Sequence, residues 1–350
     1  MINRRETRKV KVGNLYIGGD SPVTVQSMLN IPAHDIEGNI EQALRLQKAG
    51  CQIIRVAVPD MESVKTVAAL KEKVSAPIVA DIHFNYKLAL ESIAAGVDKV
   101  RINPGNIGAD ENVKAVADMC RNNGVPIRIG VNSGSVEKEI LARFGGPTPE
   151  AMAESAMYHV RLLEKFDFDD IVISIKSSNV LSMIEAYERV AERCSYPLHL
   201  GVTESGTERM GIIKSSIGIG SLLTRGIGDT IRVSLTDDPV KEVYAGFDIL
   251  KGIGLYNDTP QLVSCPTCGR TKIDLISLAK EIEDKLRFVR KNITVAVMGC
   301  AVNGPGEARE ADIGVAGGDG EGLIFKKGEI LRKVPQEKIV EELMKEIELM

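Results

Sequence analysis

Eight short runs rich in β-branched residues recur through the first two thirds of the chain and alternate with stretches of helical periodicity. Alternation of this kind is typical of a parallel sheet covered by helices, and eight is the number of strands that closes a (β/α)8 barrel. An open doubly wound sheet is the alternative, but no G-x-G-x-x-G motif follows the first run. The sequence therefore predicts a TIM barrel with strands at 23–28, 52–58, 77–83, 99–104, 126–132, 170–176, 197–203 and 230–236.

Helices are predicted between these strands, for example at 61–74, 86–95 and 111–123. Several helical stretches end at a glycine, which suits the left-handed residue that follows many helices. These glycines are Gly50, Gly96 and Gly124.

The character of the sequence changes after Gly252, where residues 254–260 read as a linker. A Cys-x-x-Cys turn follows, then a helix near 273–287 and an apolar strand at 293–298. The closing helix carries an apolar stripe that predicts a docking face. This stripe consists of Ile339, Val340, Leu343, Met344 and Ile347. Residues 1–255 are therefore predicted to form a substrate-binding barrel, and residues 256–350 a small α+β domain.

Charge and composition exclude several classes of protein. The formal net charge is −4, so there is no basic excess and a mainly electrostatic nucleic-acid binder is not expected. No uninterrupted apolar run is long enough to cross a membrane. The charged N-terminal residues lack the apolar segment of a signal peptide and are expected to lie on a solvated edge strand. A reducing cytoplasm is the expected compartment, in which neighbouring cysteines bind metal more often than they pair.

Polar residues recur at the carboxyl ends of the predicted strands, although buried parallel strands are normally continuous apolar runs. Because residues i and i+2 lie on one face of a strand, many of these polar side chains are expected to share a face. The carboxyl ends of barrel strands are also where barrel enzymes place their active sites. The residues are Arg55, Asp81, His83, Arg101, Asn103, Arg128, Asn132, Ser174, Lys176, Glu204, Arg232 and Ser234.

The cations in this set outnumber the carboxylates. Each cation taken alone could pair with a barrel carboxylate, but unpaired buried cations are costly, so the surplus predicts an anionic ligand. Several arginines and a lysine favour a diphosphate over a single carboxylate. Glu204 could act as an acid or base at the mouth of such a site, or pair with Lys176 or Arg232.

Three cysteines of the second domain form the strongest chemical signal in the sequence. Cys265 and Cys268 form a Cys-x-x-Cys turn, and Cys300 follows an apolar strand. The domain has no fourth cysteine and no histidine, so an iron–sulfur cluster fits better than structural zinc. A thioredoxin-like dithiol is the weaker alternative. Cys51, Cys120 and Cys194 are expected to be packing residues.

The fourth ligand of a cluster could be a carboxylate or an exogenous group. Residues 303–306, Asn-Gly-Pro-Gly, are predicted to turn the chain back after Cys300, which makes Glu307 the best-placed carboxylate. Glu310 and Asp312 are weaker candidates.

Six motifs together resemble the family of 4-hydroxy-3-methylbut-2-enyl diphosphate synthases of the methylerythritol phosphate pathway. The resemblance covers essentially the whole chain in its compact two-domain form and departs at no motif position. The motifs are Asp81-Ile-His83, Arg101-Ile-Asn-Pro-Gly-Asn106, Arg128-Ile-Gly-Val-Asn132, Thr203-Glu-Ser-Gly206, Cys265-Pro-Thr-Cys268 and Gly299-Cys-Ala-Val-Asn-Gly-Pro-Gly-Glu307.

The resemblance implies an oxidoreductase that reductively opens and dehydrates 2-C-methyl-D-erythritol 2,4-cyclodiphosphate on a [4Fe–4S] cluster. It implies that Cys265, Cys268, Cys300 and Glu307 ligate the cluster, and that Glu204 and Asp81 serve acid–base or positioning roles. The positions implied to hold the cyclic diphosphate are Arg55, His83, Arg101, Asn103, Arg128, Asn132, Lys176 and Ser234. Arg232 is added to this set because it lies on the predicted eighth strand.

The resemblance further implies electrons from flavodoxin or ferredoxin, and a head-to-tail homodimer in which the cluster domain of one subunit caps the barrel of its partner. Two other interpretations stay open at this point. One is a phosphate-binding barrel transferase, akin to pterin-binding enzymes, with a structural zinc tail. The other is a non-catalytic metal-binding module fused to a barrel.

Overall fold

The structure is a computed structural model that describes residues 2–287, 289–300 and 309–350. The chain divides into two compact units, residues 1–255 and residues 256–350. No helix in the described part of the chain is both long enough and apolar enough to span a membrane.

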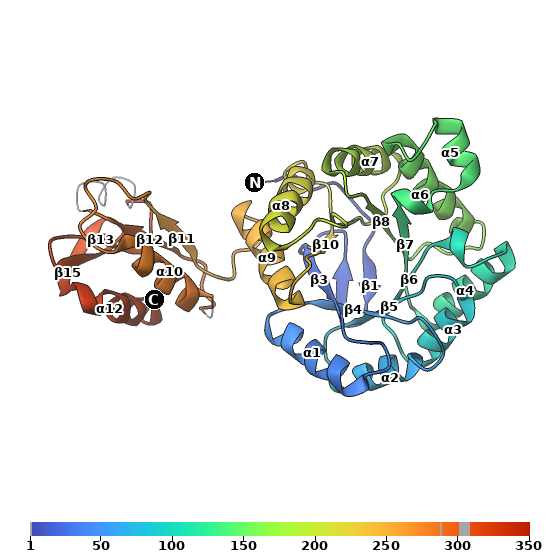
Figure 1. Cartoon of the computed structure of the whole chain (residues 1–350), viewed down its shortest axis with the longest axis horizontal. Helices are drawn as coiled ribbons and strands as arrows, with labels where there is room; N and C mark the ends of the chain where they lie inside the picture. The colour runs from blue at the N-terminus through green and yellow to red at the C-terminus, as the bar shows by residue number, and fades with distance from the viewer. Residues whose placement is uncertain (1, 288, 301–308) are drawn as a thin grey trace. The chain divides into compact units, whose positions relative to one another are not determined.

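The first unit is a (β/α)8 barrel, as the sequence predicts, and Figure 1 looks into it. Its strands lie in the order β8-β7-β6-β5-β4-β3-β10-β9 and all pair in parallel. A bridge between Ile173 and Leu198 links β8 to β9 and closes the ring. The strands are β3 (Thr24–Met28), β4 (Ile53–Ala57), β5 (Ile78–Asp81), β6 (Lys99–Ile102), β7 (Ile127–Asn132), β8 (Ile171–Lys176), β9 (His199–Leu200) and β10 (Thr230–Ile231).

The last two barrel strands are much shorter than the predicted ranges 197–203 and 230–236. The backbone leaves the sheet at Gly201 and Arg232, so Glu204 and Ser234 lie on loops that follow the strands rather than on the strands themselves. These positions therefore sit at the mouth of the barrel, where loop conformation rather than strand alternation decides their direction.

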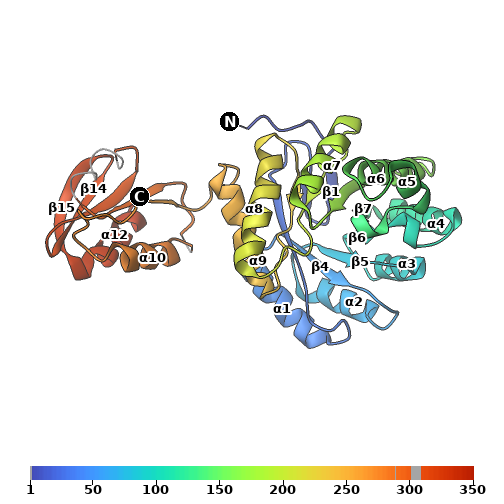
Figure 2. The ribbon, with the colours of Figure 1, turned by 45° about the horizontal axis from the view of Figure 1, so that its top comes forward.

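Helices form an outer ring around the strands in both views of the molecule (Figures 1 and 2). Local capping explains several of their ends: Asn85 and Asn179 accept hydrogen bonds from backbone N–H groups of the first turns of α3 and α7. Gly50, Gly96 and Gly124 all have positive φ, as predicted for residues that end helices. The helices are α1 (Ile36–Lys48), α2 (Val64–Lys73), α3 (Tyr86–Ala94), α4 (Asp110–Asn123), α5 (Lys138–Phe144), α6 (Pro149–Glu164), α7 (Val180–Arg193), α8 (Glu208–Thr224) and α9 (Pro239–Gly252).

A hairpin that the sequence reasoning missed packs against the amino ends of the barrel strands. It pairs β1 (Val10–Val12) with β2 (Leu15–Ile17) around Gly13, whose φ is +57°. Val12 and Ile17 form a fully buried apolar cluster with Ile53 and Val79, which lie near the starts of β4 and β5. The hairpin therefore closes this end of the barrel with apolar side chains.

In the described residues of the second unit, a five-stranded mixed sheet is accompanied by the helices α10 and α12. The order is β11-β12-β13-β14-β15, parallel from β11 to β13 and antiparallel from β13 to β15. The predicted apolar stripe of the closing helix is confirmed, because all five residues belong to or pack against the core of this unit. The elements are β11 (Gln261–Ser264), α10 (Leu275–Leu286), β12 (Thr294–Met298), β13 (Ile313–Gly317), β14 (Glu321–Lys326), β15 (Glu329–Pro335) and α12 (Ile339–Glu348).

The prediction of an N-terminal edge strand is wrong, because residues 2–9 contain no strand. Polar side chains of this segment instead form hydrogen bonds with residues of the barrel. Arg4 and Thr7 both donate to Asp229 Oδ1, at 2.9 and 3.0 Å, while Asp229 Oδ2 accepts from Leu198 N at 2.9 Å. Asp229 is only 2% exposed, so it fixes the N-terminal segment to the barrel through a buried carboxylate.

Replacing Asp229 with Ala is expected to lower the free energy of unfolding by about 3–5 kcal/mol, because it leaves the buried donors without their acceptor. Urea denaturation measures this change. The control is Asp169→Ala, which removes an exposed ion pair with Arg8 and is expected to cost about 0–1 kcal/mol. Equal losses in the two variants would contradict the anchoring role of Asp229.

Candidate functional site

Asp81 is the centre of a buried ionic cluster at the carboxyl ends of β4, β5 and β6. Its carboxylate lies 3.7 Å from Arg55 Nε, 3.3 Å from Arg101 Nη1 and 3.5 Å from His83 Nε2. Burial by itself would raise the pKa of Asp81, but these three neighbours outweigh it and hold the pKa well below its usual range. Asp81 is therefore ionised and orients two arginines.

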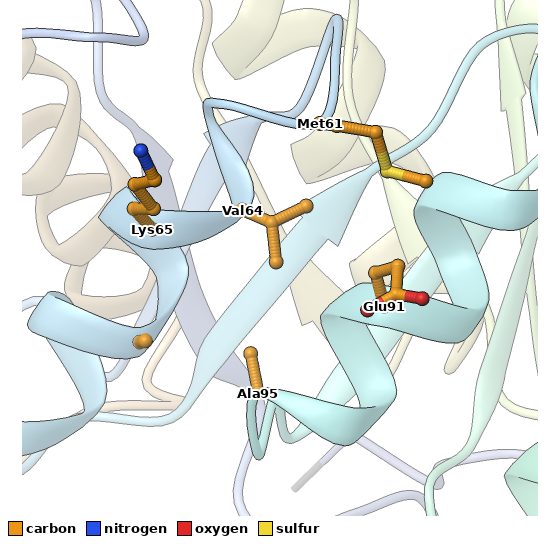
Figure 3. A pocket seen from close by; sticks show the side chains of 6 residues that line it. Met61, Val64, Lys65, Glu91 and Ala95 are labelled. Carbon is orange, nitrogen blue, oxygen red and sulfur yellow. The ribbon is translucent and has the colours of Figure 1, made fainter.

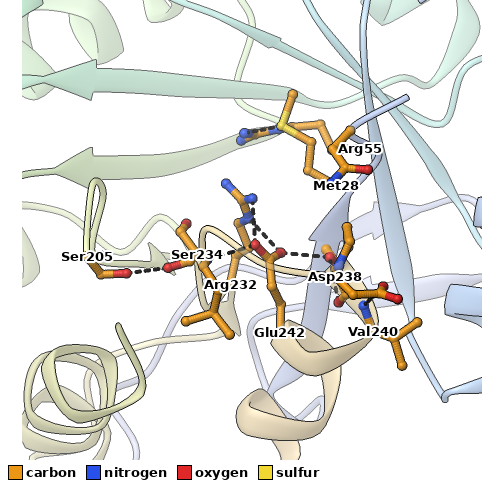
Figure 4. A network of polar contacts seen from close by, with 12 residues as sticks. Met28, Arg55, Ser205, Arg232, Ser234, Asp238, Val240 and Glu242 are labelled. Atoms are coloured by element: carbon orange, nitrogen blue, oxygen red, sulfur yellow. Dashed lines mark hydrogen bonds and ion pairs between the residues drawn. The ribbon is translucent and has the colours of Figure 1, made fainter. Parts of the chain in front are cut away.

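Arg55 keeps hydrogen-bonding capacity for a better acceptor than its present one. Its Nε and Nη2 atoms contact the Met28 sulfur at 3.0 and 2.7 Å (Figure 4). A thioether is a weak acceptor, so a ligand oxygen would bind this guanidinium more strongly. Burial lowers the pKa of Arg55 to about 10, which still leaves it charged at neutral pH.

Arg101 fits against β7 because position 130 is a glycine. Arg101 Nη2 donates to the Gly130 carbonyl at 3.2 Å. A Cβ atom at position 130 would lie 2.2 Å from Arg101 Nε, which is far inside contact distance. Gly130 therefore provides the space in which the guanidinium reaches Asp81.

Arg232 is already paired within the protein, so the alternative interpretation holds for this cation. It binds Glu242 with Nη2···Oε1 of 3.1 Å and Nε···Oε2 of 3.3 Å (Figure 4). Glu242 lies on α9, is 2% exposed and also accepts from Ser27 Oγ and Leu235 N. The pairing of Glu242 with Arg232 was not predicted, because no sequence pattern links a glutamate on a helix to the strand-end residues.

Two other predicted cations point into the barrel without a carboxylate partner among the described residues. Arg128 is fully buried and its Nη1 donates to Gln26 Oε1 at 3.1 Å, across the barrel from β7 to β3. Lys176, at the end of β8, is 9% exposed. Burial and then the neighbouring Arg55 and Arg232 lower the pKa of Lys176, so its surroundings are strongly positive.

Sequence reasoning also missed three polar residues deeper in the barrel. Gln26, Lys99 and His199 are fully buried on β3, β6 and β9. Lys99 lies two residues before Arg101 and so on the same face of β6, a spacing that was available in the sequence.

The remaining predicted residues lie at the mouth. His83 is about half exposed. Asn103 is buried and its Oδ1 accepts from Gly105 N at 3.1 Å, which caps the short 3-10 turn Pro104–Asn106. Asn132 N donates to Ser135 Oγ at 3.0 Å. The Ser234 carbonyl accepts from Ser205 Oγ (Figure 4), which ties the loops after β9 and β10 together.

Glu204 is exposed on the loop after β9 and has φ of +51°. A positive φ is uncommon for a residue other than glycine and stores local strain. The predicted alternative pairing with Lys176 or Arg232 is not found among the described residues, and Arg232 has Glu242 instead. Glu204 is thus held at the mouth by its backbone rather than by an ion pair.

Two surface clefts lie away from this cluster. The larger, of about 450 Å³, lies between α2 and α3 and is lined by Met61, Val64, Lys65, Ala68, Glu91 and Ala95 (Figure 3). It holds one cation and one carboxylate, so it lacks the positive surplus of the barrel mouth.

The three cysteines of the second unit lie at one edge of its sheet. Cys265 directly follows β11 and Cys300 follows β12, and these parallel strands pair in register at Ser264 and Val297. Gly299 N donates to Cys265 Sγ at 3.2 Å. Cys268 is exposed and Cys300 buried. All six cysteines of the chain lie in the described part and none forms a disulfide.

Arg270 gives this edge a positive charge. Hydrogen bonds from its backbone and then its guanidinium lower the pKa of the Cys268 thiol. The charges of Cys268, Cys300 and Cys265 all act on Arg270, so the three thiols lie around one cation. The thiolate is the form that binds metal, and this environment favours it at Cys268.

The donor set of this edge is three thiols, which are ligands of the kind that iron–sulfur clusters use. Within the described residues, no group of three or more His, Cys, Asp or Glu side chains converges as the ligands of one metal ion do. In a cluster, the cysteines bind separate irons, so their sulfurs need not converge on one point. Asp312 is committed to the sheet, since its Oδ2 accepts from Thr294 N at 2.8 Å, and Glu310 is exposed. Glu307 lies outside the described residues.

The fold and these two groups of residues define an α/β barrel protein with a cationic strand-end cluster and a thiol-bearing second domain. The chain belongs to the GcpE family. The model of the GcpE TIM-barrel domain matches residues 7–247, and that of the GcpE protein C-terminal domain matches residues 261–349. The family resemblance stated from the motifs is thereby confirmed.

Relatives match along their whole length. A protein of Clostridium perfringens is 59% identical over 347 residues, which cover 99% of each chain. One of Clostridium acetobutylicum is 59% identical over 349 residues, which cover 100% of each chain to the nearest per cent. Both carry the name 4-hydroxy-3-methylbut-2-en-1-yl diphosphate synthase (flavodoxin).

Among solved structures, the dihydropteroate synthase of Yersinia pestis in a sulfonamide complex aligns with a TM-score of 0.51 and 13% identity. The alignment covers 71% of this chain and 100% of that one. A likeness at this identity shows the barrel fold alone, and it does not support the transferase interpretation.

Replacing Asp81 with Asn is expected to lower the free energy of unfolding at neutral pH by about 3–5 kcal/mol, because Arg55 and Arg101 lose their buried counter-charge. The folded-state pKa of Asp81 lies below its unfolded value of about 3.9, so the ionised group stabilises the fold above that pH and loses this effect as pH falls. The difference between wild type and D81N should therefore shrink below about pH 4 in urea titrations.

Asp60→Asn is the control, since it breaks an exposed Asp–His pair with His34. It should change stability little at any pH. A D81N deficit that is the same at pH 7 and at pH 3 would show that Asp81 is not held ionised by its neighbours.

Proposed function

We propose that this chain is an oxidoreductase that converts 2-C-methyl-D-erythritol 2,4-cyclodiphosphate into 4-hydroxy-3-methylbut-2-enyl diphosphate. The reaction opens the cyclic diphosphate, removes water and consumes two electrons. The observation that carries the proposal is the surplus of buried cations around Asp81, because a diphosphate supplies the negative charge that these residues lack. The name borne by full-length relatives at 59% identity supports the same reaction.

In this proposal the barrel mouth binds the diphosphate. Arg55 and Arg101 are held in place by Asp81, and Lys176 adds a point charge from the end of β8. His83, Asn103, Asn132 and Ser234 lie at the same mouth. Arg128 reaches the ligand from below, while Arg232 acts through its pair with Glu242. Positive charge at this place also stabilises the phosphate that is expelled when the ring opens.

A [4Fe–4S] cluster is the proposed cofactor, held by Cys265, Cys268 and Cys300. Glu307 is proposed as the fourth ligand on the family resemblance. When bound, the cluster supplies the two electrons one at a time. The Gly299 N–H at 3.2 Å from Cys265 Sγ and the nearby Arg270 are groups of the kind that tune such a centre.

Glu204 is proposed to deliver a proton to the oxygen that leaves as water. Its place at the mouth, free of an ion pair within the described residues, leaves the carboxyl available for this transfer. Asp81 is a positioning residue, since its low pKa keeps it ionised and unable to donate.

Electrons are proposed to come from flavodoxin, as the relatives' name states for them, or from ferredoxin. We further propose a head-to-tail homodimer in which the second domain of one subunit serves the barrel of its partner, and a cytoplasmic location that keeps the six thiols reduced.

Anaerobically purified protein tests the function directly. Incubation with the cyclic diphosphate and a low-potential reductant should form the linear diphosphate product, detected by mass spectrometry. Colourless protein with zinc and no turnover would overturn the proposal in favour of a structural metal.

Replacing Cys265, Cys268 or Cys300 singly with Ser is expected to abolish broad visible absorption and to lower bound iron by at least about tenfold, because each supplies one iron with its thiolate. Iron, sulfide and absorbance are measured after anaerobic purification. The control is Cys194→Ser, in which a half-buried cysteine of the barrel unit is replaced. Full iron content in the three variants would contradict the ligand assignment.

Replacing Glu204 with Gln should lower kcat by about 10²–10⁴-fold with little change in substrate affinity, because only proton transfer is removed. Single-turnover kinetics and equilibrium binding separate the two effects. Glu208→Gln is the control, since Glu208 is exposed near the same loop and pairs with Lys241. Unchanged turnover in E204Q would exclude the proton-donor role.

A further inference from the structure

The barrel interior below the ionic cluster contains polar residues that the proposed reaction does not use. Gln26, Lys99 and His199 are fully buried on three different strands, and the inner edge of Arg128 lies among them. Buried polar atoms are normally hydrogen-bonded, so any without a partner require an explanation.

These residues carry buried nitrogen atoms that have no hydrogen-bond partner among the described residues. The atoms are Gln26 Nε2, Lys99 Nζ, Arg128 Nε and Nη2, and His199 Nε2. Gln26 Oε1 already binds Arg128, and Asp81 binds the arginines above. The buried Thr24 hydroxyl, on the same face of β3 as Gln26, also has no partner among the described residues and can donate. His199 Nδ1 lies 3.4 Å from Thr230 Oγ1, and in the tautomer in which Nδ1 accepts from this hydroxyl Nε2 is left to donate.

Strand register brings these groups to one region. Thr230 of β10 pairs with His199 of β9 and with Thr24 of β3. The Gln26–Arg128 bond spans the interior between β3 and β7. An eight-stranded barrel has an interior just wide enough for side chains, so donors from facing strands lie close together. The apolar hairpin cluster closes this region toward the amino ends.

The electrostatics agree with this geometry. Burial and then the charge of Arg128 lower the pKa of Lys99, and burial followed by Arg128, Lys176 and Lys99 lowers that of His199. In both cases the neighbours that act are cations. No counter-charge lies among these groups in the described part of the chain, so the charged forms of Lys99 and His199 are disfavoured, and a bound anion would stabilise them.

We propose that the barrel interior binds a small monovalent anion of chloride size, held by Lys99, His199 and Gln26 with the inner N–H groups of Arg128. These ligands and the neighbouring Thr24 hydroxyl can all donate to a halide, whereas a water molecule would also need acceptors for its two hydrogens. The complete burial of the region favours a monatomic ion over a phosphate. This anion would lie below the diphosphate and neutralise cations that the substrate does not reach.

The test compares thermal stability in sodium bromide and in sodium gluconate at equal ionic strength, because gluconate is too large for the interior. In the wild type, bromide at about ten times its Kd should raise Tm by about 2–3 °C. Lys99→Met keeps the length of the side chain and removes the charge, and it should abolish this rise.

Lys176→Met is the matched control, because it removes a buried lysine at the mouth. It should keep the bromide effect and weaken binding of the cyclic diphosphate, whereas K99M should retain that binding to within a few-fold. An equal bromide effect in wild type and K99M would overturn the proposal, as would its absence in the wild type.

Crystals of the wild type grown in bromide decide the matter independently of how well K99M folds. An anomalous peak within contact distance of Lys99 Nζ is expected. Bromide found only at the mouth near Arg55, or no peak in the interior, would overturn the internal site.

Discussion

The barrel mouth depends on one carboxylate that is shared among three cationic or titratable side chains. Asp81 sits at the end of β5, between the arginines of the two neighbouring strands. Two guanidinium groups would otherwise repel each other in a region with little water to screen them. Asp81 gives each guanidinium a fixed partner on one side, and further N–H groups contact the Met28 sulfur and the Gly130 carbonyl. The site is therefore preorganised before any ligand arrives, and binding requires little rearrangement of these side chains.

The second domain uses its sheet in a related way. Parallel pairing of β11 with β12 brings the segments that carry Cys265 and Cys300 to the same edge, although 35 positions separate them in the sequence. The strands set the spacing of the backbone, and Arg270 sets the charge around the thiols. In both domains the reactive groups lie where parallel strands end, so a rigid sheet fixes them while loops shape their surroundings.

Much of the barrel fold could be predicted, because it follows from local sequence patterns. The alternation of β-branched runs and helices predicted the closed barrel, and polar residues at strand ends marked its mouth. Contacts between distant elements were not predictable: Gln26 meets Arg128 across 102 positions, and Glu242 reaches Arg232 from a helix whose other buried residues are mostly apolar or small. The β1–β2 hairpin did leave a signal, since apolar residues alternate on both sides of Gly13-Asn14. The roles of the individual site residues remain predictions, because neither fold nor family membership assigns them.

In the described residues, that hairpin covers the amino ends of barrel strands with apolar side chains. Val12 and Ile17 pack there against Ile53 and Val79, so we expect a ligand to enter and to leave at the carboxyl ends of the strands. Product and the next substrate then compete for a single passage, and any element that covers the mouth during catalysis must open once in every cycle. In such an enzyme, the turnover rate depends on how quickly an element that covers the barrel mouth opens to release product.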